Sequence, residues 1–254
     1  MDLKLKGRRA LVTGSTAGIG YAIARGLAVE GARVTLTGRS QGSVEAALGR
    51  LRDEVPDARA DGIAADCASA SGAEQVFAGV AECDILINNL GIYERRAFFD
   101  IADPAHHVRF ARRYAPAMAR RGWGRVIFVS SESALNIPKE MIHYGTTKTA
   151  QLSISRGLAM ELAGTGVTVN ALLPGPTRTE TTDRLRAERA KAAGKTVEEI
   201  EREFFVNFRP TSLLKRFTSA EEVANLAVYL CGEGASATTG AALRVDGGTV
   251  NQIM

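Results

Sequence analysis

Two side chains with complementary acid–base chemistry lie four positions apart in the chain, Tyr144 and Lys148. On a helix, that spacing places both on one face. An ammonium group beside a phenol favours the phenolate, and so lowers a pKa that is about 10 in the free tyrosine side chain. Such a tyrosine can donate or accept a proton near neutral pH. Alone the pair is a weak signal, because many helix surfaces carry this spacing by chance.

A glycine-rich segment near the N-terminus strengthens that signal. Thr13-Gly14-Ser15-Thr16-Ala17-Gly18-Ile19-Gly20 follows a short apolar run over 9–13 and precedes a predicted helix over 21–30. Strand, glycine turn and helix form the context of a dinucleotide-binding loop, in which the backbone approaches a pyrophosphate at the helix N-terminus. The spacing is G-x-x-x-G-x-G rather than G-x-G-x-x-G, and an ordinary strand-to-helix turn is the alternative interpretation.

Predicted strands and helices alternate along the whole chain, and this alternation indicates a parallel sheet with helices on both faces. We predict one α/β domain over 1–254, a Rossmann-type doubly wound sheet in a three-layer α/β/α arrangement. The further predicted strands are 33–37, 60–65, 85–87, 125–129, 167–172 and 241–245. The further predicted helices are 43–51, 73–80, about 104–120, one that carries Tyr144 and ends near 162, and 220–230.

Composition narrows the class of protein. The 254 residues are 45% hydrophobic, which is ample for a core. We find no signal-peptide pattern and no apolar run long enough to span a bilayer, so no membrane association is expected. Cys67, Cys83 and Cys231 are scattered and odd in number. This pattern predicts buried, reduced thiols and a cytoplasmic protein.

The charge pattern argues against nucleic acid as a partner. The formal net charge is +4, and the basic residues are spread along the chain. The densest cluster lacks interleaved aromatic residues and is interpreted as a solvated helix face. Its members are Arg109, Arg112, Arg113, Arg120, Arg121 and Arg125. His106, His107 and His143 have no acidic or cysteine partners in a metal-ligand spacing, so no metal site is predicted.

The motifs together resemble the short-chain dehydrogenase/reductase (SDR) superfamily over nearly the whole chain. They are the glycine loop, Asn88-Asn89-Leu90-Gly91, Ser131, Tyr144-x-x-x-Lys148 and Val245-Asp246-Gly247-Gly248, in the family's order. The resemblance implies a nicotinamide-dependent oxidoreductase that moves a hydride between the cofactor and an alcohol or carbonyl. It also implies a small-molecule substrate and a homo-oligomer, a tetramer or a dimer.

The same resemblance assigns roles to individual residues. Tyr144 would pass the proton, Ser131 would hydrogen-bond the substrate oxygen, and Lys148 would lower the tyrosine pKa and bond the nicotinamide ribose. Thr177 or Thr179 would meet the carboxamide. The implied cofactor-binding residues are Thr13, Gly14, Ser15, Gly18, Ile19, Gly20, Arg39, Asp66, Asn88, Gly91, Tyr144, Lys148, Pro174, Gly175, Thr177 and Thr179.

The end of the second strand bears on the choice between NADP and NAD. NAD-preferring relatives carry an acidic residue there, whereas this chain has Gly38 followed by Arg39. An arginine can hold a 2′-phosphate through charge-assisted bonds. We therefore predict NADP as the preferred cofactor, with NAD possible. Asp66 resembles the family's adenine-contacting aspartate, although a lone loop aspartate is more often a turn former.

The chain departs from the family's pattern at two places. The segment over 92–124 is short by roughly three helical turns of about 3.6 residues and lacks the family's catalytic asparagine. Asp103 falls near that position, but before Pro104 it is better interpreted as a helix N-cap. Leu90 stands where the family usually has alanine; it either narrows the cofactor pocket or packs against the sheet.

A charged, helix-prone insertion over about 178–212 corresponds to the segment that covers the substrate pocket in the family. A solvated helical hairpin is the alternative interpretation, and the two are compatible. The shortened segment also supports a rival hypothesis, a cofactor-binding protein with little or no turnover that acts as a sensor or assembly partner. Substrate, direction and stereochemistry do not follow from fold and motif.

Overall fold

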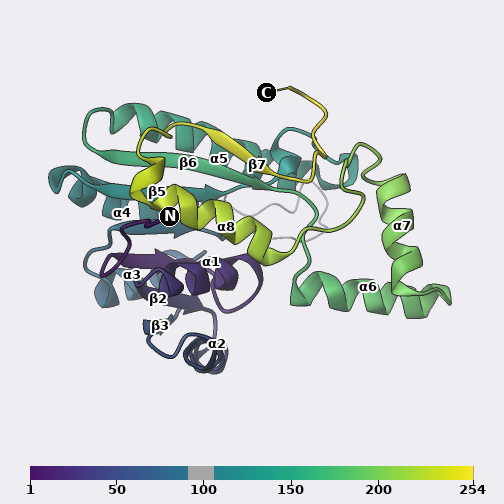
Figure 1. Ribbon diagram of the computed structural model, residues 1–254, viewed down its shortest axis with the longest axis horizontal. Helices are drawn as coiled ribbons and strands as arrows, with labels where there is room; N and C mark the ends of the chain where they lie inside the picture. The colour runs from purple at the N-terminus through teal and green to yellow at the C-terminus, as the bar shows by residue number, and fades with distance from the viewer. Residues whose placement is uncertain (91–105, 254) are drawn as a thin grey trace.

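A parallel sheet positions every motif described above. The computed structural model describes residues 1–90 and 106–253, and in these the sheet has seven strands in the order β3-β2-β1-β4-β5-β6-β7 (Figure 1). The strands are β1 (Arg9–Val12), β2 (Arg33–Gly38), β3 (Arg59–Ala64), β4 (Ile85–Asn88), β5 (Gly124–Val129), β6 (Val167–Pro174) and β7 (Ala242–Val245). Strand order reverses between β1 and β4, the switch point where such sheets bind their ligands. The predicted Rossmann-type α/β fold is confirmed.

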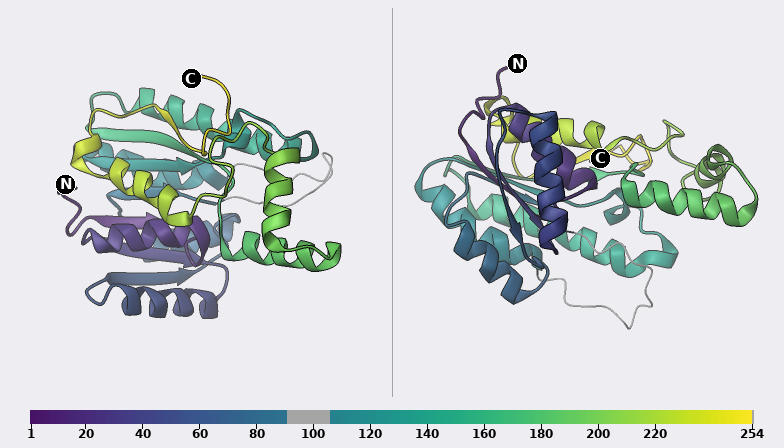
Figure 2. Two further views of the ribbon diagram at one scale, coloured as in Figure 1. Left: turned by 45° about the vertical axis from the view of Figure 1, so that its right-hand side comes forward. Right: turned by 90° about the horizontal axis from the view of Figure 1, so that it is seen from below.

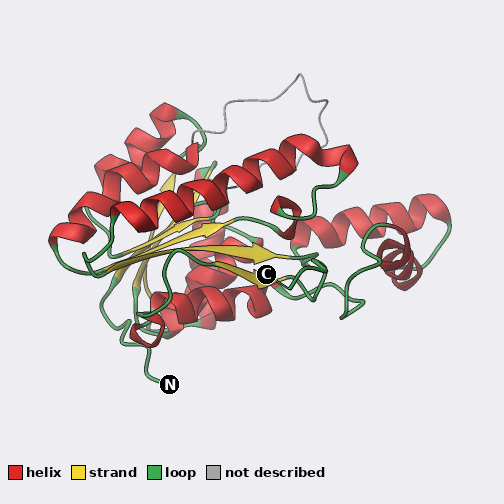
Figure 3. Ribbon diagram, turned by 90° about the horizontal axis from the view of Figure 1, so that it is seen from above, coloured by secondary structure: helices red, strands yellow, loops and turns green. Residues whose placement is uncertain are grey.

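Helices cover both faces of the sheet (Figure 3). One hydrophobic core lies under α1, α2 and α8, and a second lies under α3, α4 and α5. The helices are α1 (Gly18–Val29), α2 (Gln41–Glu54), α3 (Ala70–Gly79), α4 (His106–Arg120), α5 (Ile142–Glu161), α6 (Glu180–Ala193), α7 (Val197–Asn207) and α8 (Ala220–Cys231). Short 3-10 turns occur at Glu132–Ala134, Lys139–Met141 and Glu233–Ala235.

The element bounds differ from the predicted ones at several ends, for local reasons. Helix α1 begins at Gly18 rather than at position 21, because two loop glycines form its first turn. Helix α3 begins at Ala70 rather than at 73, since the Ser69 hydroxyl accepts a hydrogen bond from the Gly72 amide and caps the helix there. Strand β6 continues to Pro174, two residues beyond its predicted end.

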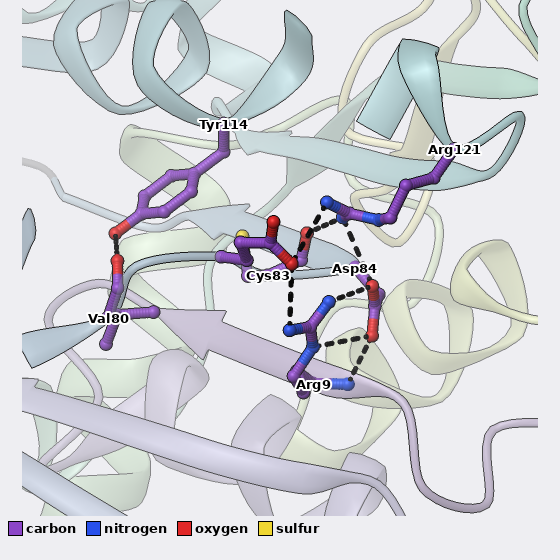
Figure 4. Close-up of polar contacts among 7 residues, drawn as sticks. Arg9, Val80, Cys83, Asp84, Tyr114 and Arg121 are labelled. Atoms are coloured by element: carbon purple, nitrogen blue, oxygen red, sulfur yellow. Dashed lines mark hydrogen bonds and ion pairs between the residues drawn. The ribbon is translucent and has the colours of Figure 1, made fainter. Parts of the chain in front are cut away.

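An ionic cluster joins the amino-terminal ends of β1 and β4 (Figure 4). The predicted site residues lie at the other, carboxyl ends of the strands. Asp84, just before β4, accepts hydrogen bonds from the Arg9 amide at 2.9 Å and from its guanidinium at 3.0 and 3.2 Å. Arg121, after α4, donates to the Cys83 carbonyl at 2.7 Å and to the Asp84 carboxylate at 3.2 Å. The cluster therefore joins β1, β4 and α4 at one end of the molecule.

The prediction that the arginine cluster forms a solvated helix face is wrong for Arg125. Arg125 lies in β5 and is only 1% exposed. Its guanidinium lies 4.4 Å from the Trp123 ring centroid and 3.7 Å from the Glu233 carboxylate. The long apolar stem and the aromatic stacking let this arginine be buried with a partner. The sequence gives no sign of this, because Glu233 is far away along the chain.

The insertion forms a helical hairpin, α6–α7, which projects beyond the carboxyl ends of the strands (Figure 2). Stacked and edge-on aromatic rings, with centroids 5.0 to 6.0 Å apart, pack α7 against the segment that precedes α8. These rings are Phe204, Phe205, Phe208 and Phe217. Thr179 and Thr196 begin the two helices with reciprocal capping boxes. This small aromatic core connects the hairpin to the segment before α8 and is separate from the two cores of the sheet.

The three cysteines are buried and free, as the sequence predicts. Over residues 1–90 and 106–253, no helix has both the length and the apolar character that crossing a membrane requires. The same residues contain no group of three or more His, Cys, Asp or Glu side chains arranged to hold a metal ion.

Candidate active site

The carboxyl ends of the central strands bring the predicted site residues to one edge of the sheet. The glycine loop follows β1, Asn88 ends β4, Ser131 follows β5 and Pro174 ends β6. Helix α5 carries Tyr144 and Lys148 past the end of β5. Residues far apart in sequence therefore converge at the switch point between β1 and β4, where an α/β sheet binds its ligand.

Polar groups of neighbouring strands hold the glycine loop. The Asn89 side-chain amide donates to the carbonyls of Thr13 and Gly14, at 3.2 and 2.9 Å. A Cβ at Gly20 would lie 2.4 Å from that Asn89 nitrogen, so the loop and α1 can approach β4 only with glycine there. This role of Asn89 was not predicted from the sequence, because nothing in the motif distinguishes Asn89 from the adjacent Asn88.

The hydroxyl groups of the loop are used inside the protein. Thr13 and Ser15 are fully buried, and their hydroxyls donate to the carbonyls of Ile87 and Val12. The Ser15 hydroxyl also accepts from the Thr37 amide, and the Thr37 hydroxyl accepts from the Gly14 amide. Both predicted residues therefore shape the loop, and the amides of Thr13, Gly14 and Ser15 are likewise bonded within the protein.

The start of α1 fits a bound anion. Its N-cap residue, Ala17, makes no side-chain hydrogen bond to the helix, so the first-turn amides of Gly18, Ile19 and Gly20 lack the usual serine or aspartate cap. Such amides and the helix dipole favour negative charge. In this structure the Gly18 amide donates to a carboxylate oxygen of Glu180 at 3.0 Å. The observed contact shows that a negative charge fits at this helix start; pyrophosphate binding by the loop stays a prediction.

Lys148 and Tyr144 lie on one face of α5, as their spacing predicts. The Lys148 ammonium is 5.6 Å from the Tyr144 ring centroid and donates to the Val129 carbonyl at 3.0 Å. The lysine side chain is buried, and burial lowers its pKa from 10.5 to about 8. Tyr144 is half-buried. A cationic group is therefore held beside the phenol at the end of β5.

Ser131 lies at the end of β5 and begins a 3-10 turn. Its hydroxyl oxygen accepts a hydrogen bond from the Ser133 amide at 3.1 Å, and its side chain is buried. The neighbouring Ser130 hydroxyl donates instead to the Lys148 carbonyl at 2.8 Å, and so joins the strand to α5. The two adjacent serines, which the sequence cannot tell apart, thus have different partners.

The segment that follows β4 is only partly described. The Asn88 side-chain nitrogen is buried and has no hydrogen-bond partner among residues 1–90 and 106–253. Leu90 packs against the core under α3, α4 and α5 and lies beside Gly14, which favours the packing interpretation. The predicted residue Gly91, and with it Asp103 and Pro104, lie outside the described residues.

The segment after β6 packs tightly and begins the hairpin. The Thr177 hydroxyl donates to the Gly175 carbonyl at 2.9 Å and is bonded to the Thr218 hydroxyl, while the Thr179 hydroxyl caps α6. A Cβ at Gly175 would lie 2.6 Å from the Asp246 backbone, so glycine lets this segment pass the end of β7. The proposed carboxamide contact of Thr177 or Thr179 stays a prediction.

The remaining two predicted cofactor residues lie at the ends of β2 and β3. Arg39 is exposed directly after β2. The Asp66 carboxylate accepts a hydrogen bond from the Ala68 amide at 3.1 Å, so it forms the local turn that its sequence context predicts. An adenine contact of Asp66 stays a prediction.

Comparison with known proteins agrees with this geometry. A family model described as short chain dehydrogenase matches residues 8–190. An uncharacterized oxidoreductase of Bacillus subtilis, YvaG, is 42% identical over the full length of both chains. D-beta-hydroxybutyrate dehydrogenase of Rhizobium meliloti is 31% identical, with 96% of this chain and 99% of the relative covered. The crystal structure of L-sorbose reductase from Gluconobacter frateurii, complexed with NADPH and L-sorbose, superposes with a TM-score of 0.91 at 31% identity, covering both chains fully.

Proposed function

Because this chain belongs to the short-chain dehydrogenase/reductase family of nicotinamide-dependent oxidoreductases, we propose that it interconverts an alcohol and a ketone with NADP as the preferred cofactor. One observation carries the proposal. Lys148 is buried within 5.6 Å of the Tyr144 ring, at the edge where the glycine loop and Ser131 also lie. Burying a lysine is unfavourable, and a positively charged group beside a phenol has a direct use in proton transfer.

Each of the three residues has one task in the proposed reaction. A bound nicotinamide supplies or accepts the hydride. Tyr144 passes a proton between its phenol oxygen and the substrate oxygen, and the Lys148 ammonium stabilises the phenolate that proton donation leaves. The Ser131 oxygen already accepts from the Ser133 amide, so its own proton is free to be donated to the substrate oxygen. These groups act on the oxygen of the substrate, so they do not determine the rest of its structure.

The preference for NADP rests on the end of β2. A Cβ at position 38 would lie 2.4 Å from the Thr16 side chain, so an acidic side chain there would require Thr16 to move. Arg39 is exposed beside it and carries a positive charge toward solvent, where a 2′-phosphate can reach it. The L-sorbose reductase complex with NADPH supports the same cofactor.

Titration of NADPH and NADH into the purified protein, followed by turnover against a panel of ketones, tests the proposal. We expect NADPH to bind more tightly and ketone reduction to occur. Tyr144→Phe should abolish turnover and leave NADPH binding intact, whereas the control Tyr229→Phe, on the exposed surface of α8, should change neither. Turnover that survives Tyr144→Phe would refute the assignment of the proton donor. Binding without any turnover would favour the sensor hypothesis.

We further propose a cytoplasmic homo-oligomer, in keeping with the free cysteines. A groove of about 530 Å³ runs between α4 and α5, beside the core that these helices share with the sheet. It is lined by Ala111, Ala115, Pro116, Leu158 and Leu162 among others. An apolar groove between two helices suits the same groove of a second copy. Light scattering of the parent and of Ala119→Glu, at a half-buried position of the groove, would test it, because a charge in the groove should yield monomers.

A further inference from the structure

A buried carboxylate lies next to Ser131. Glu132 follows it in the 3-10 turn, and its side chain is 4% exposed. Its oxygen Oε1 accepts a hydrogen bond from Arg209 Nε at 2.9 Å. Arg209 lies directly after α7, so this ion pair joins the turn that carries Ser131 to the end of the α6–α7 hairpin.

Hydrogen bonds extend from this ion pair to the serine hydroxyl. The Ser133 hydroxyl donates to the same Glu132 oxygen at 3.2 Å, and the Ser133 backbone amide donates to the Ser131 hydroxyl oxygen at 3.1 Å. Ser133 is therefore fixed at its side chain by Glu132 and fixes Ser131 through its backbone. The position of Arg209 thus bears on the orientation of the Ser131 hydroxyl.

The charge of Glu132 depends on the hairpin. Burial raises the pKa of Glu132, and the Arg209 guanidinium opposes that rise. The other carboxylate oxygen, Oε2, is buried and has no hydrogen-bond partner in the part of the chain that the structure describes. A buried carboxylate that loses its cationic partner is strongly destabilised. Glu132 therefore holds this position only while Arg209 does.

Arg209 is in turn held by the hairpin. A second nitrogen of its guanidinium donates to the Phe208 carbonyl at 2.9 Å, and the group lies 5.9 Å from the Phe204 ring centroid. Both phenylalanines belong to the aromatic core of α6–α7. Movement of the hairpin as a unit would therefore carry Arg209 with it.

We propose that Glu132 is a positioning residue that acts on Ser131 through Ser133, and that Arg209 makes this positioning depend on the closed hairpin. Closure over a substrate and alignment of the Ser131 hydroxyl are then a single event. The inference rests on the proposed function, because it gives Ser131 a part in turnover.

Matched substitutions at the two ends of the ion pair test the inference. Glu132→Leu and Arg209→Met should each lower kcat/KM for ketone reduction by at least about tenfold, with an unchanged Kd for NADPH. Glu132→Gln, which keeps an acceptor for Arg209, should retain more activity than Glu132→Leu. The double variant Glu132→Leu/Arg209→Met should be no worse than either single variant, because both break the same connection.

Lys195→Met serves as the control, since it breaks an ion pair with Glu203 within the same hairpin, away from Ser131; its kcat/KM should match the parent. If Glu132→Leu does not fold, Arg209→Met tests the same connection from the hairpin side. Parental kcat/KM in Arg209→Met, a matching loss of NADPH affinity, or multiplied losses in the double variant would each overturn the inference. A parent without Tyr144-dependent turnover would instead refute the proposed function, and the inference with it.

Discussion

The carboxylate of Glu180 accepts a hydrogen bond from the Gly18 backbone amide at 3.0 Å, so the first residue of α6 lies against the first residue of α1. Arg50 of α2 lies 3.3 Å from the same carboxylate. Burial raises the pKa of Glu180, but backbone amides and Arg50 outweigh it and hold the pKa below its usual 4.5. A negative charge of the hairpin therefore lies at the helix N-terminus where we propose that a cofactor phosphate binds.

This contact predicts that Glu180→Gln strengthens NADPH binding. A cofactor phosphate must approach the amides that Glu180 now contacts, and removing its charge removes a repulsion. The Kd for NADPH should fall about two- to fivefold, since a charge at a helix N-terminus contributes roughly 0.3–1 kcal/mol. Fluorescence titration measures it. Glu188→Gln removes an equal charge from the exposed surface of α6 and should have no effect. Weaker NADPH binding in Glu180→Gln would contradict this prediction and would mean that the carboxylate helps to hold the bound cofactor.

Arg39→Ala should remove the preference between the two cofactors. Without the guanidinium, the 2′-phosphate of NADPH loses its charge-assisted hydrogen bonds. NADH carries no 2′-phosphate, so its binding should not be affected. We expect the Kd for NADPH to rise about ten- to a hundredfold and that for NADH to stay the same. Arg52→Ala, at an exposed position of α2, is the control for net charge. Equal changes for both cofactors would make Arg39 a surface residue without a role in the choice.

Lys148→Met should make the cofactor-free protein more stable at pH 7. Burial lowers the lysine pKa from 10.5 to about 8, so the unfolded chain keeps this proton at pH values where the folded chain has lost it. The resulting penalty is fully present below pH 8 and fades as the pH rises towards 10.5. The pKa shift corresponds to a penalty of about 3 kcal/mol. This value is an upper limit, because the hydrogen bond from the lysine to the Val129 carbonyl offsets part of the penalty.

Urea denaturation of the parent and Lys148→Met at pH 7 and near pH 10 measures this effect. The difference in unfolding free energy should shrink at the higher pH, and ketone turnover should be lost in the variant. Lys6→Met, at an exposed position, controls for the loss of a charge. A variant less stable than the parent at both pH values would mean that the lysine contributes to the fold.

Asp84→Asn should weaken the fold and leave the site unchanged. Burial would raise the pKa of Asp84, but hydrogen bonds from Arg9 outweigh it and hold the pKa below 3.8. The ion pair therefore stabilises the fold above that pH and ceases to do so as the pH falls through the folded pKa. We expect a loss of about 1–3 kcal/mol at pH 7, discounted for the partly exposed Arg9.

Denaturation at pH 7 and below pH 3.8 would measure the Asp84 effect, and the gap between parent and variant should close in acid. The Kd for NADPH should not change, because the cluster (Figure 4) lies at the amino-terminal ends of β1 and β4, away from the predicted site at the carboxyl ends of the strands. Asp57→Asn, an exposed aspartate, is the matched control. A gap that persists in acid would mean that packing rather than charge is lost.

The sheet and the glycine loop were predictable from the sequence because their signals are local. Apolar runs, glycine spacing and the four-residue interval of Tyr144 and Lys148 each depend on a few consecutive residues. The contacts of Glu132, Arg125 and Glu180 were not predictable, since each depends on a partner far along the chain that only the folded backbone brings near. Of these three residues, only Glu132 had a signal in the sequence, because it is a charged residue among the serines that end a buried strand.

The aromatic core of the hairpin also bears on how this protein could acquire a new substrate. Phe204 and Phe205 of α7 pack on Phe217, which precedes α8, and these rings lie apart from the two cores under the sheet. Residues on its outer surface can then vary with little effect on the sheet or on Tyr144. New substrates can thus arise through changes on this outer surface, whereas Arg209 and Glu180 must be kept, because they connect the hairpin to Glu132 and to the Gly18 amide.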